Sequence, residues 1–230
     1  MIDVYTAHTP NGVKVPIALE ELRVPYRVHR INRGANEQKR PEFLRLNPNG
    51  RIPAIVDPDG PGGAPLSVFE SGAILWYLAE KFPGLMPGDP IERIRALEYT
   101  FFQVGGIGPM FGQAGWFARH SEQVPLAIDR YQAEARRLSA VLDARLQSTP
   151  WLAGQSYSVA DVMNFGWLRA PQYAGVRLDV YPAVQDWGER IAARGAAGAA
   201  GDCLSVSCSE AAVQKAGVAL RHAPSIQMSV

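Results

Sequence analysis

The chain has 230 residues, 47% of them hydrophobic, which is enough to build the cores of two modest domains packed together. Its 23 basic and 22 acidic residues give a formal net charge of +1 and no charged tail, so there is no electrostatic footprint for nucleic acid. No window approaches the ~20 apolar residues that span a bilayer, and the amino terminus has no basic run or long apolar stretch. We therefore expect a cytoplasmic protein with no nucleic-acid or membrane partner, acting on a small polar ligand.

The first third of the chain predicts a mixed α/β domain. Short β-prone runs and apolar residues at helical spacing alternate in the order β-α-β-α-β-β-α. The turn-forming stretch 57–63 makes the last two strands an antiparallel hairpin on a sheet that begins in parallel. Strands are expected at 2–7, 26–32, 53–57 and 66–69, and helices at 13–23, 41–46 and 71–82.

After Phe82 the sequence turns to a run of Pro and Gly, and strand signals nearly vanish beyond it. Helices are expected at 91–117, 124–147, 158–170 and 182–194. Residues 195–209 are rich in Gly and Ser and aperiodic, so we expect an irregular, insertion-like loop there, followed by a last helix at 210–220. The sequence thus predicts an α/β domain at 1–83 and an all-helical domain at 91–230.

The cysteines and histidines give no sign of a disulfide framework or a metal site. Cys203 and Cys208 both lie near the carboxy terminus, so neither can staple the main body of the chain. The four histidines are far apart, and none has a second His or Cys at metal-ligand spacing. We expect no bound metal and no catalytic cysteine.

The loop Thr9-Pro10-Asn11-Gly12 runs from the first strand into a helix, whose amino-terminal amides and dipole would stabilise an anion or a thiolate. The Thr9 hydroxyl and the Asn11 amide can donate hydrogen bonds to a sulfur, but neither group can be the nucleophile in disulfide exchange. Taken alone, the same residues also suit an ordinary turn and helix cap.

Two further turns each lead into a regular element. In 47–56, Pro53 opens a strand, and a cis bond before it would leave the backbone of Ile52 facing outward, where an extended peptide ligand could pair. Glu70 and Ser71 stand at a helix start, where amides capture a carboxylate and the acid takes an ammonium group. An acid beside an anion site suits an α-amino acid head group, although each segment alone also fits a plain turn or cap.

Together these segments, followed by Ser-x-Ala-Asp at 158–161 in a helical domain, resemble the glutathione transferase superfamily. The chain most closely resembles the bacterial nu class, glutathione-dependent disulfide-bond oxidoreductases related to the yeast nitrogen-regulatory prion protein. The resemblance runs from Met1 to about Arg194 and includes 101–110 and 181–184. It implies a thioredoxin-like glutathione-binding domain, an all-helical second domain and a homodimer.

By that resemblance, Thr9 and Asn11 face the glutathione sulfur, and Ile52, before a cis Pro53, pairs with the cysteinyl backbone. Because the amino-terminal domain has no cysteine, glutathione itself would be the nucleophile and its thiolate would attack a substrate disulfide. Conjugation of glutathione to electrophiles and reduction of organic hydroperoxides use the same thiolate and remain alternatives. A non-catalytic glutathione-binding regulatory protein is a further one.

The resemblance also assigns the two ends of glutathione. Glu70 and Ser71 would hold the γ-glutamyl end, and Gln38 would contact the glycyl end. Arg130 would reach a glutathione in the neighbouring subunit. The charged residues around Arg130 fit a solvated helix face equally well.

Overall fold

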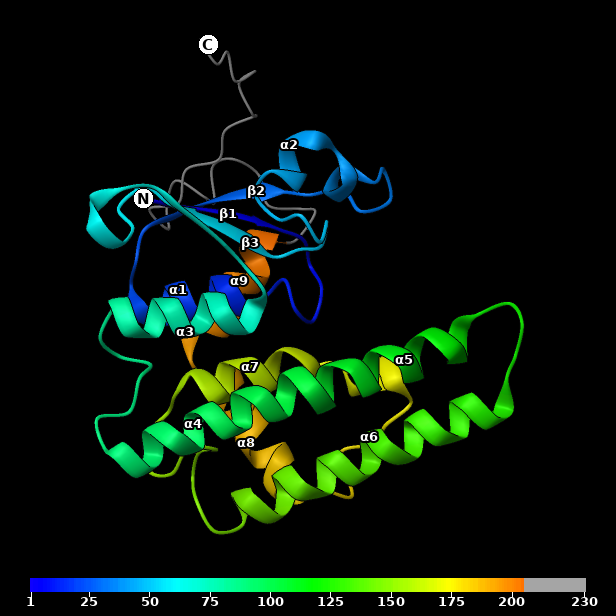
Figure 1. Cartoon of the computed structure of the whole chain (residues 1–230). Coiled ribbons are helices and arrows are strands. Elements are labelled where there is room, and N and C mark those ends of the chain that lie inside the picture. Colours follow the sequence, from blue (N-terminus) through cyan, green and yellow to red (C-terminus); the bar gives the residue numbers. More distant parts are fainter. Residues whose placement is uncertain (205–230) are drawn as a thin grey trace.

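The computed structural model describes residues 1–204, which form an α/β lobe stacked on a helical lobe (Figure 1). A four-stranded mixed sheet in the order β2-β1-β3-β4 forms the centre of the first lobe. Strand β1 (Ile2–Thr6) pairs in parallel with β2 (Tyr26–Arg30) and antiparallel with β3 (Ala54–Asp57), which forms a hairpin with β4 (Leu66–Phe69). The predicted thioredoxin-like arrangement, a parallel start closed by an antiparallel hairpin, is confirmed.

Helices α1 (Lys14–Leu22) and α3 (Ser71–Lys81) lie between the sheet and the helical lobe, and the short α2 (Pro41–Leu44) lies on the other side (Figure 1). Their apolar positions recur at helical spacing, so each helix turns one face onto the sheet. Burying each large apolar side chain contributes about 1.5–3 kcal/mol, which makes this face the main source of the lobe's stability. The buried side chains include Val4, Val15, Leu19, Ile55, Ile74, Leu75 and Leu78.

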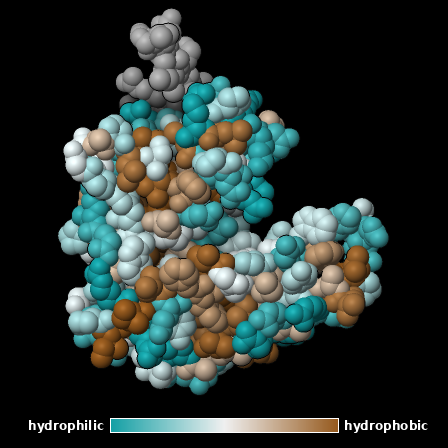
Figure 2. Space-filling model, in the orientation of Figure 1, coloured by the Kyte–Doolittle hydropathy of each residue, from teal (hydrophilic) through white to brown (hydrophobic). Residues whose placement is uncertain are grey.

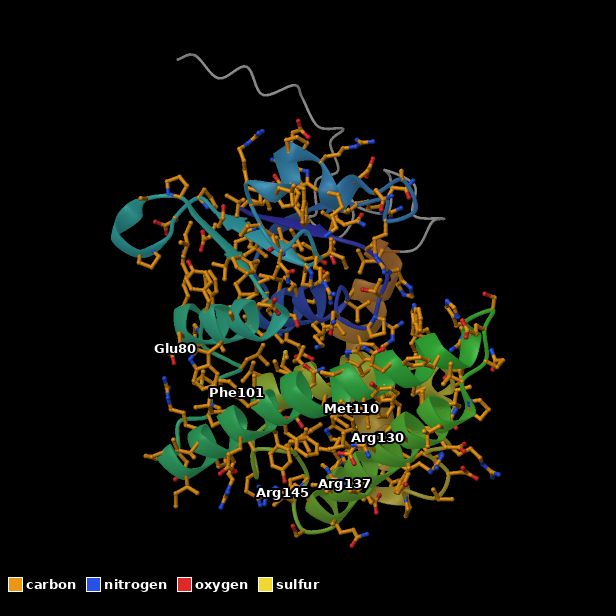
Figure 3. All side chains as sticks on the ribbon, turned by 45° about the vertical axis from the view of Figure 1, so that its right-hand side comes forward. Glu80, Phe101, Met110, Arg130, Arg137 and Arg145 are labelled. Carbon is orange, nitrogen blue, oxygen red and sulfur yellow. The ribbon has the colours of Figure 1, made fainter. Side chains whose placement is uncertain are left out.

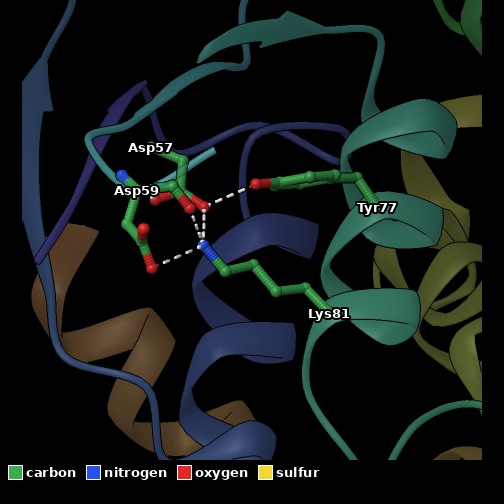
Figure 4. A network of polar contacts seen from close by, with 4 residues as sticks. All are labelled: Asp57, Asp59, Tyr77 and Lys81. Atoms are coloured by element: carbon green, nitrogen blue, oxygen red, sulfur yellow. Dashed lines mark hydrogen bonds and ion pairs between the residues drawn. The ribbon is translucent and has the colours of Figure 1, made fainter. Parts of the chain in front are cut away.

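A charged network ties the β3–β4 hairpin to α3 (Figure 4). Asp57, buried at the end of β3, accepts hydrogen bonds from the Tyr77 hydroxyl at 2.6 Å and from Lys81 Nζ at 2.7 Å. Lys81 Nζ also lies 3.6 Å from the Asp59 carboxylate. Burial alone would raise the pKa of Asp57, but the hydrogen bonds from Lys81 and Tyr77 outweigh it and hold the pKa below its usual value.

The second lobe is helical, as predicted, but the first of its predicted helices is interrupted. A single helix was expected over 91–117, but a π-helical turn at Gln103–Ile107 divides it. Such turns carry an extra residue and often occur at functional sites. The helices are α4 (Pro90–Phe102), α5 (Gly108–Arg119), α6 (Pro125–Leu146), α7 (Val159–Leu168) and α8 (Pro182–Ala192). The division into domains at 1–83 and 91–230 stays a proposal.

Helix α7 is buried along its whole length and begins at a capping box. Asp161 accepts from the Ser158 amide at 2.9 Å, from the Leu152 amide at 3.0 Å and from Trp187 Nε1 at 2.8 Å. Burial outweighs these donors and raises the pKa of Asp161 to about 6. The start of α7 is therefore pinned both to the preceding loop and to α8.

The prediction of an irregular loop at 195–209 is wrong for its first ten residues, because they form helix α9 (Gly195–Leu204). This helix packs against α1 of the first lobe, where Ala200 and Leu204 are buried. The alanines of α9 have the highest helix propensity, and packing against α1 offsets the low helix propensity of its glycines. The local sequence cannot show this packing. Residues 205–209 and the helix predicted at 210–220 lie outside the described residues.

Candidate functional site

The loop between β1 and α1 is held tightly onto the start of the helix. The Thr6 hydroxyl donates to the Gly12 carbonyl at 2.8 Å, and the Thr9 hydroxyl oxygen accepts from the Gly12 amide at 2.9 Å. A Cβ on Gly12 would lie 2.0 Å from the Ala7 carbonyl oxygen, so the loop can close this tightly only around glycine. Because Thr9 accepts that bond through a lone pair, its hydroxyl proton remains available for a ligand.

Two donors fix the orientation of the Asn11 carboxamide. Lys14 Nζ lies 2.8 Å and Trp167 Nε1 lies 2.9 Å from Asn11 Oδ1. An indole N–H can only donate, so the atom that faces Trp167 must be the amide oxygen. The amide nitrogen of Asn11, with its two hydrogens, consequently points away from both donors.

The turn before β3 brings its own hydrogen bonds to the same region. Asn47 is buried, its Nδ2 donates to the Arg51 carbonyl at 2.5 Å, and its Oδ1 accepts from the Asn49 amide at 2.9 Å. These bonds shape the turn locally, as an Asx side chain does when it replaces backbone partners. The Ile52–Pro53 peptide bond that ends the turn is cis, as predicted from the sequence.

The junction of β4 and α3 is strained at Glu70, whose φ of +69° lies in a region that non-glycine residues rarely adopt. Such strain gathers at functional sites. The exposed Glu70 carboxylate lies 3.5 Å from Asn49 Nδ2. Ser71 follows as the first residue of α3, where the helix amides and dipole favour an anion.

These three turns meet around one small pocket of about 110 Å³. Amide, guanidinium, carboxylate and hydroxyl groups line it, so it can make hydrogen bonds to a polar ligand with charges of both signs. Figure 2 shows an open recess between the two lobes, on the side where the α5–α6 pair projects. The pocket is lined by Asn11, Asn47, Asn49, Arg51, Ile52, Pro53, Glu70 and Ser71.

Most of the predicted binding residues are therefore brought together. Asn11, Ile52, Pro53, Glu70 and Ser71 all line the pocket. The sequence reasoning missed the other lining residues, although the Asn-Pro-x-Gly turn that contains two of them was recognised as a turn. It also missed Lys14, which contacts Asn11 and Ser71 of the pocket lining. The only sign of Lys14 in the sequence is that a lysine stands inside an apolar run.

Three predicted residues are not among those lining the pocket. Thr9 lies two positions from Asn11, in the same loop. Gln38 lies in a 3-10 turn after β2, next to the turn before β3, since a Cβ on Gly50 would lie 3.0 Å from the Gln38 carbonyl oxygen. Among the described residues, the buried Gln38 Oε1 has no hydrogen-bond partner.

Arg130 lies apart from this pocket, on the exposed face of α6 (Figure 3). It borders a wider groove of about 500 Å³ whose lining residues all belong to that one helix. Ion pairs such as Glu134 with Arg137, 2.7 Å apart, neutralise part of this face. The groove is a shallow hollow in an open surface, and within a single chain Arg130 does not reach the pocket.

Among the side chains that the structure describes, no three of His, Cys, Asp or Glu come close enough together to hold a metal ion. The absence of a metal cofactor stays a prediction. Over the same residues, no helix combines the length and the hydropathy needed to cross a membrane.

Comparison with known proteins identifies the family. The family model of the glutathione S-transferase amino-terminal domain matches residues 9–81, and that of the carboxy-terminal domain matches residues 109–195. The chain is 49% identical over 202 residues to the disulfide-bond oxidoreductase YfcG of Escherichia coli strain K12, and the match covers 87% of this chain and 94% of YfcG.

Two similar solved structures contain glutathione. A glutathione transferase family member from Pseudomonas fluorescens pf-5, with two glutathione bound, is 42% identical with a TM-score of 0.82, covering 86% of this chain and 91% of its own. A glutathione transferase from Pseudomonas putida, with one glutathione disulfide bound per subunit, is 40% identical with a TM-score of 0.81, covering 90% and 91%. The chain belongs to the glutathione S-transferase family, as its motifs indicate.

Proposed function

We propose that this protein is a glutathione-dependent disulfide-bond reductase of the nu class that uses bound glutathione as its thiol and no cysteine of its own. The observation that carries the proposal is a polar pocket with an oriented amide at Asn11 and no cysteine in its lining. The only cysteines of the chain are Cys203 and Cys208. Glutathione disulfide bound to the Pseudomonas putida relative, and the name of YfcG, support the same activity.

The pocket fits the parts of glutathione in order. The Glu70 carboxylate would take the γ-glutamyl ammonium, and Ser71 with the start of α3 would take its carboxylate. The backbone of Ile52 would pair with the cysteinyl residue, and Gln38 would meet the glycyl end. This placement directs the cysteinyl sulfur towards Asn11.

The reaction consumes two glutathiones for each substrate disulfide. A glutathione thiolate attacks one substrate sulfur, forming a mixed disulfide and releasing the other half of the substrate as a thiolate. A second glutathione thiolate then attacks the glutathione sulfur of the mixed disulfide. The products are glutathione disulfide and two substrate thiols, so both electrons come from glutathione. Thr9 and Asn11 promote the attack by donating hydrogen bonds that lower the pKa of the glutathione thiol.

The test is reduction of 2-hydroxyethyl disulfide by glutathione, coupled to NADPH consumption through glutathione reductase. Turnover should survive in a Cys203→Ser/Cys208→Ser variant. A hydrogen bond to a charged group is worth about 1.5–3 kcal/mol, so Thr9→Ala should lower kcat/KM by roughly ten- to a hundredfold, while Thr9→Ser keeps the hydroxyl and most of the activity. Full activity in Thr9→Ala would contradict the role of Thr9.

Other outcomes would replace the proposal. Turnover of a chlorinated nitroaromatic or of cumene hydroperoxide, without disulfide reduction, would assign the protein to conjugation or peroxide reduction. Tight glutathione binding without turnover of any of these substrates would assign it to sensing.

We further propose that the protein is a cytoplasmic homodimer. Ile94, Phe101 and Val104 are 57%, 66% and 44% exposed along α4 and the π-helical turn, an apolar surface suited to a second subunit. Figure 3 labels Phe101, near the end of α4. Arg130 would then act on the glutathione of the partner. In sedimentation velocity, Phe101→Glu should yield monomers, whereas Val180→Glu, at an exposed apolar residue elsewhere, should not.

A further inference from the structure

Lys14 is the one lysine in the described part of the chain that has no exposed surface at all. It is the first residue of α1, and its Nζ lies 2.8 Å from Asn11 Oδ1, 2.8 Å from Gln103 Oε1 and 3.4 Å from Ser71 Oγ. Burying an ammonium group is costly, and an apolar side chain of the same length would fill the space without that cost. Packing alone therefore does not account for a lysine at this position.

The partners of Lys14 come from separate parts of the chain. Asn11 and Ser71 line the pocket, whereas Gln103 belongs to the π-helical turn of the helical lobe. Helix α7 closes over the lysine stem, because a Cβ on Gly166 would lie 2.9 Å from Lys14 Cγ and 3.0 Å from Lys14 Cε. Lys14 thus joins the floor of the pocket to the second lobe.

We propose that Lys14 is a positioning residue that holds the Asn11 carboxamide with its NH₂ group towards the sulfur of the bound thiol. The inference rests on the proposed glutathione site. Asn11 can serve a thiolate only as a donor, since its oxygen would repel the negative sulfur. Lys14 and Trp167 both hold that oxygen, from opposite lobes, and thereby turn the donor side outward.

This arrangement works in either protonation state of Lys14. An ammonium group has three N–H donors for the three oxygens around it, whereas a neutral amine can donate to Asn11 and Gln103 and accept from the Ser71 hydroxyl. Burial lowers the pKa of Lys14 well below its usual value, and the nearby carboxylate of Glu70 opposes this shift. The orientation of Asn11 is accordingly independent of the charge on Lys14.

The experiment measures the thiol pKa of bound glutathione from thiolate ultraviolet absorbance in the binary complex, together with the pH profile of kcat/KM. Lys14→Met should raise this pKa by about one pH unit, so that below it kcat/KM falls roughly tenfold and at high pH recovers towards wild type. Lys81→Met, which removes a lysine paired with a buried carboxylate away from the pocket, should leave the thiol pKa unchanged. A purely structural role would lower activity equally at every pH and would overturn the proposal.

Substitutions of Asn11 separate orientation from other effects of Lys14. Asn11→Asp keeps an oxygen for Lys14 but turns a second oxygen to the sulfur, so it should raise the thiol pKa more than Asn11→Ala does. In an Asn11→Ala background, Lys14→Met should change the thiol pKa no further. A full Lys14 effect in that background would overturn the proposal.

A milder variant keeps the test decisive if Lys14→Met does not fold. Trp167→Phe removes the other donor to Asn11 and keeps a smaller aromatic ring in its place. It should raise the thiol pKa by less than Lys14→Met does, and an unchanged pKa would overturn the proposal. Because the measurement needs only bound glutathione, its result is separate from disulfide turnover. A wild-type protein that binds glutathione without reducing disulfides would refute the proposed function and leave this inference standing.

Discussion

A Gly166→Ala substitution would show whether α7 sets the position of the loop that carries Thr9 and Asn11. The added Cβ would lie 2.4 Å from the Pro10 carbonyl oxygen, whereas ordinary contact begins near 3.4 Å. The loop and α7 would have to separate by about 1 Å to relieve this contact. The carbonyl belongs to the backbone, so no flexible side-chain end can move aside instead.

The structure gives the size of the effect. Overpacking a filled interior costs about 1–3 kcal/mol, and a clash with backbone falls at the upper end, about 3 kcal/mol. Replacing a helical glycine by alanine returns about 1 kcal/mol, which leaves a net loss of about 2 kcal/mol. In a protein of this size that lowers Tm by about 4–8 °C. A displacement of about 1 Å at a reacting group costs up to roughly a hundredfold in rate, so kcat/KM for 2-hydroxyethyl disulfide should fall markedly as well.

Thermal unfolding followed by circular dichroism and the coupled reductase assay would measure both effects. Gly188→Ala is the matched control, because Gly188 also lies in a helix, α8, but has no heavy atom within 4 Å of an added Cβ. Gly188→Ala should raise the free energy of unfolding by up to about 1 kcal/mol and leave kcat/KM unchanged. Equal stability in the two variants would refute the packing argument. Lower stability with unchanged turnover in Gly166→Ala would refute the link between α7 and the loop.

Three further predictions concern titrating and binding groups. Asp161→Asn should lower the free energy of unfolding by about 3 kcal/mol in urea titrations, because its NH₂ group would face the N–H donors that the carboxylate accepts from in the wild type. The pKa of the Asp161 carboxyl is about 6 in the folded protein and 3.8 in the unfolded chain, so the folded protein binds this proton more tightly. The free energy of unfolding of the wild type should therefore fall as pH rises from 3.8 to 6, and Asp161→Asn should lack this dependence. Asp57 has the opposite shift, so its stabilisation is lost as pH falls below the usual Asp range, and Lys81→Met should move acid unfolding to higher pH. Ser71→Ala should weaken glutathione binding in calorimetry and change kcat less than KM, because in the proposed complex Ser71 meets the γ-glutamyl end.

The sequence could predict the pocket because its walls are local structures. A threonine-proline-asparagine loop, a turn ending in cis Pro53 and a helix start at Ser71 each follow from the chemistry of a few adjacent residues. The topology then places them together. A parallel β-α-β unit followed by a hairpin puts the end of β1 and the starts of β3 and α3 on the same edge of the sheet.

What the sequence could not predict depends on partners far away along the chain. A lysine beside Val13 and Val15 suggests a solvated helix end, yet Lys14 is buried because Gln103, 89 positions later, accepts from it. Helix α9 likewise depends on contact with α1, since its run of Ala and Gly has no periodic apolar face to predict a helix. The positive φ of Glu70 has no signal either, because no glycine marks it.

The candidate site therefore contains residues from both lobes. Asn11 belongs to the thioredoxin-like lobe, but Trp167, which donates a hydrogen bond to its oxygen, belongs to the helical lobe. Gln103 of the helical lobe also contributes, because it accepts a hydrogen bond from Lys14, which in turn contacts Asn11. A polar network across an interface costs desolvation unless every group in it is satisfied. Here the Lys14 nitrogen and the Asn11 oxygen each have hydrogen-bond partners in both lobes. The contact between the lobes is therefore favoured only in the arrangement that orients the Asn11 amide. In the proposed glutathione complex, the same contacts that hold the lobes together set the geometry at the sulfur.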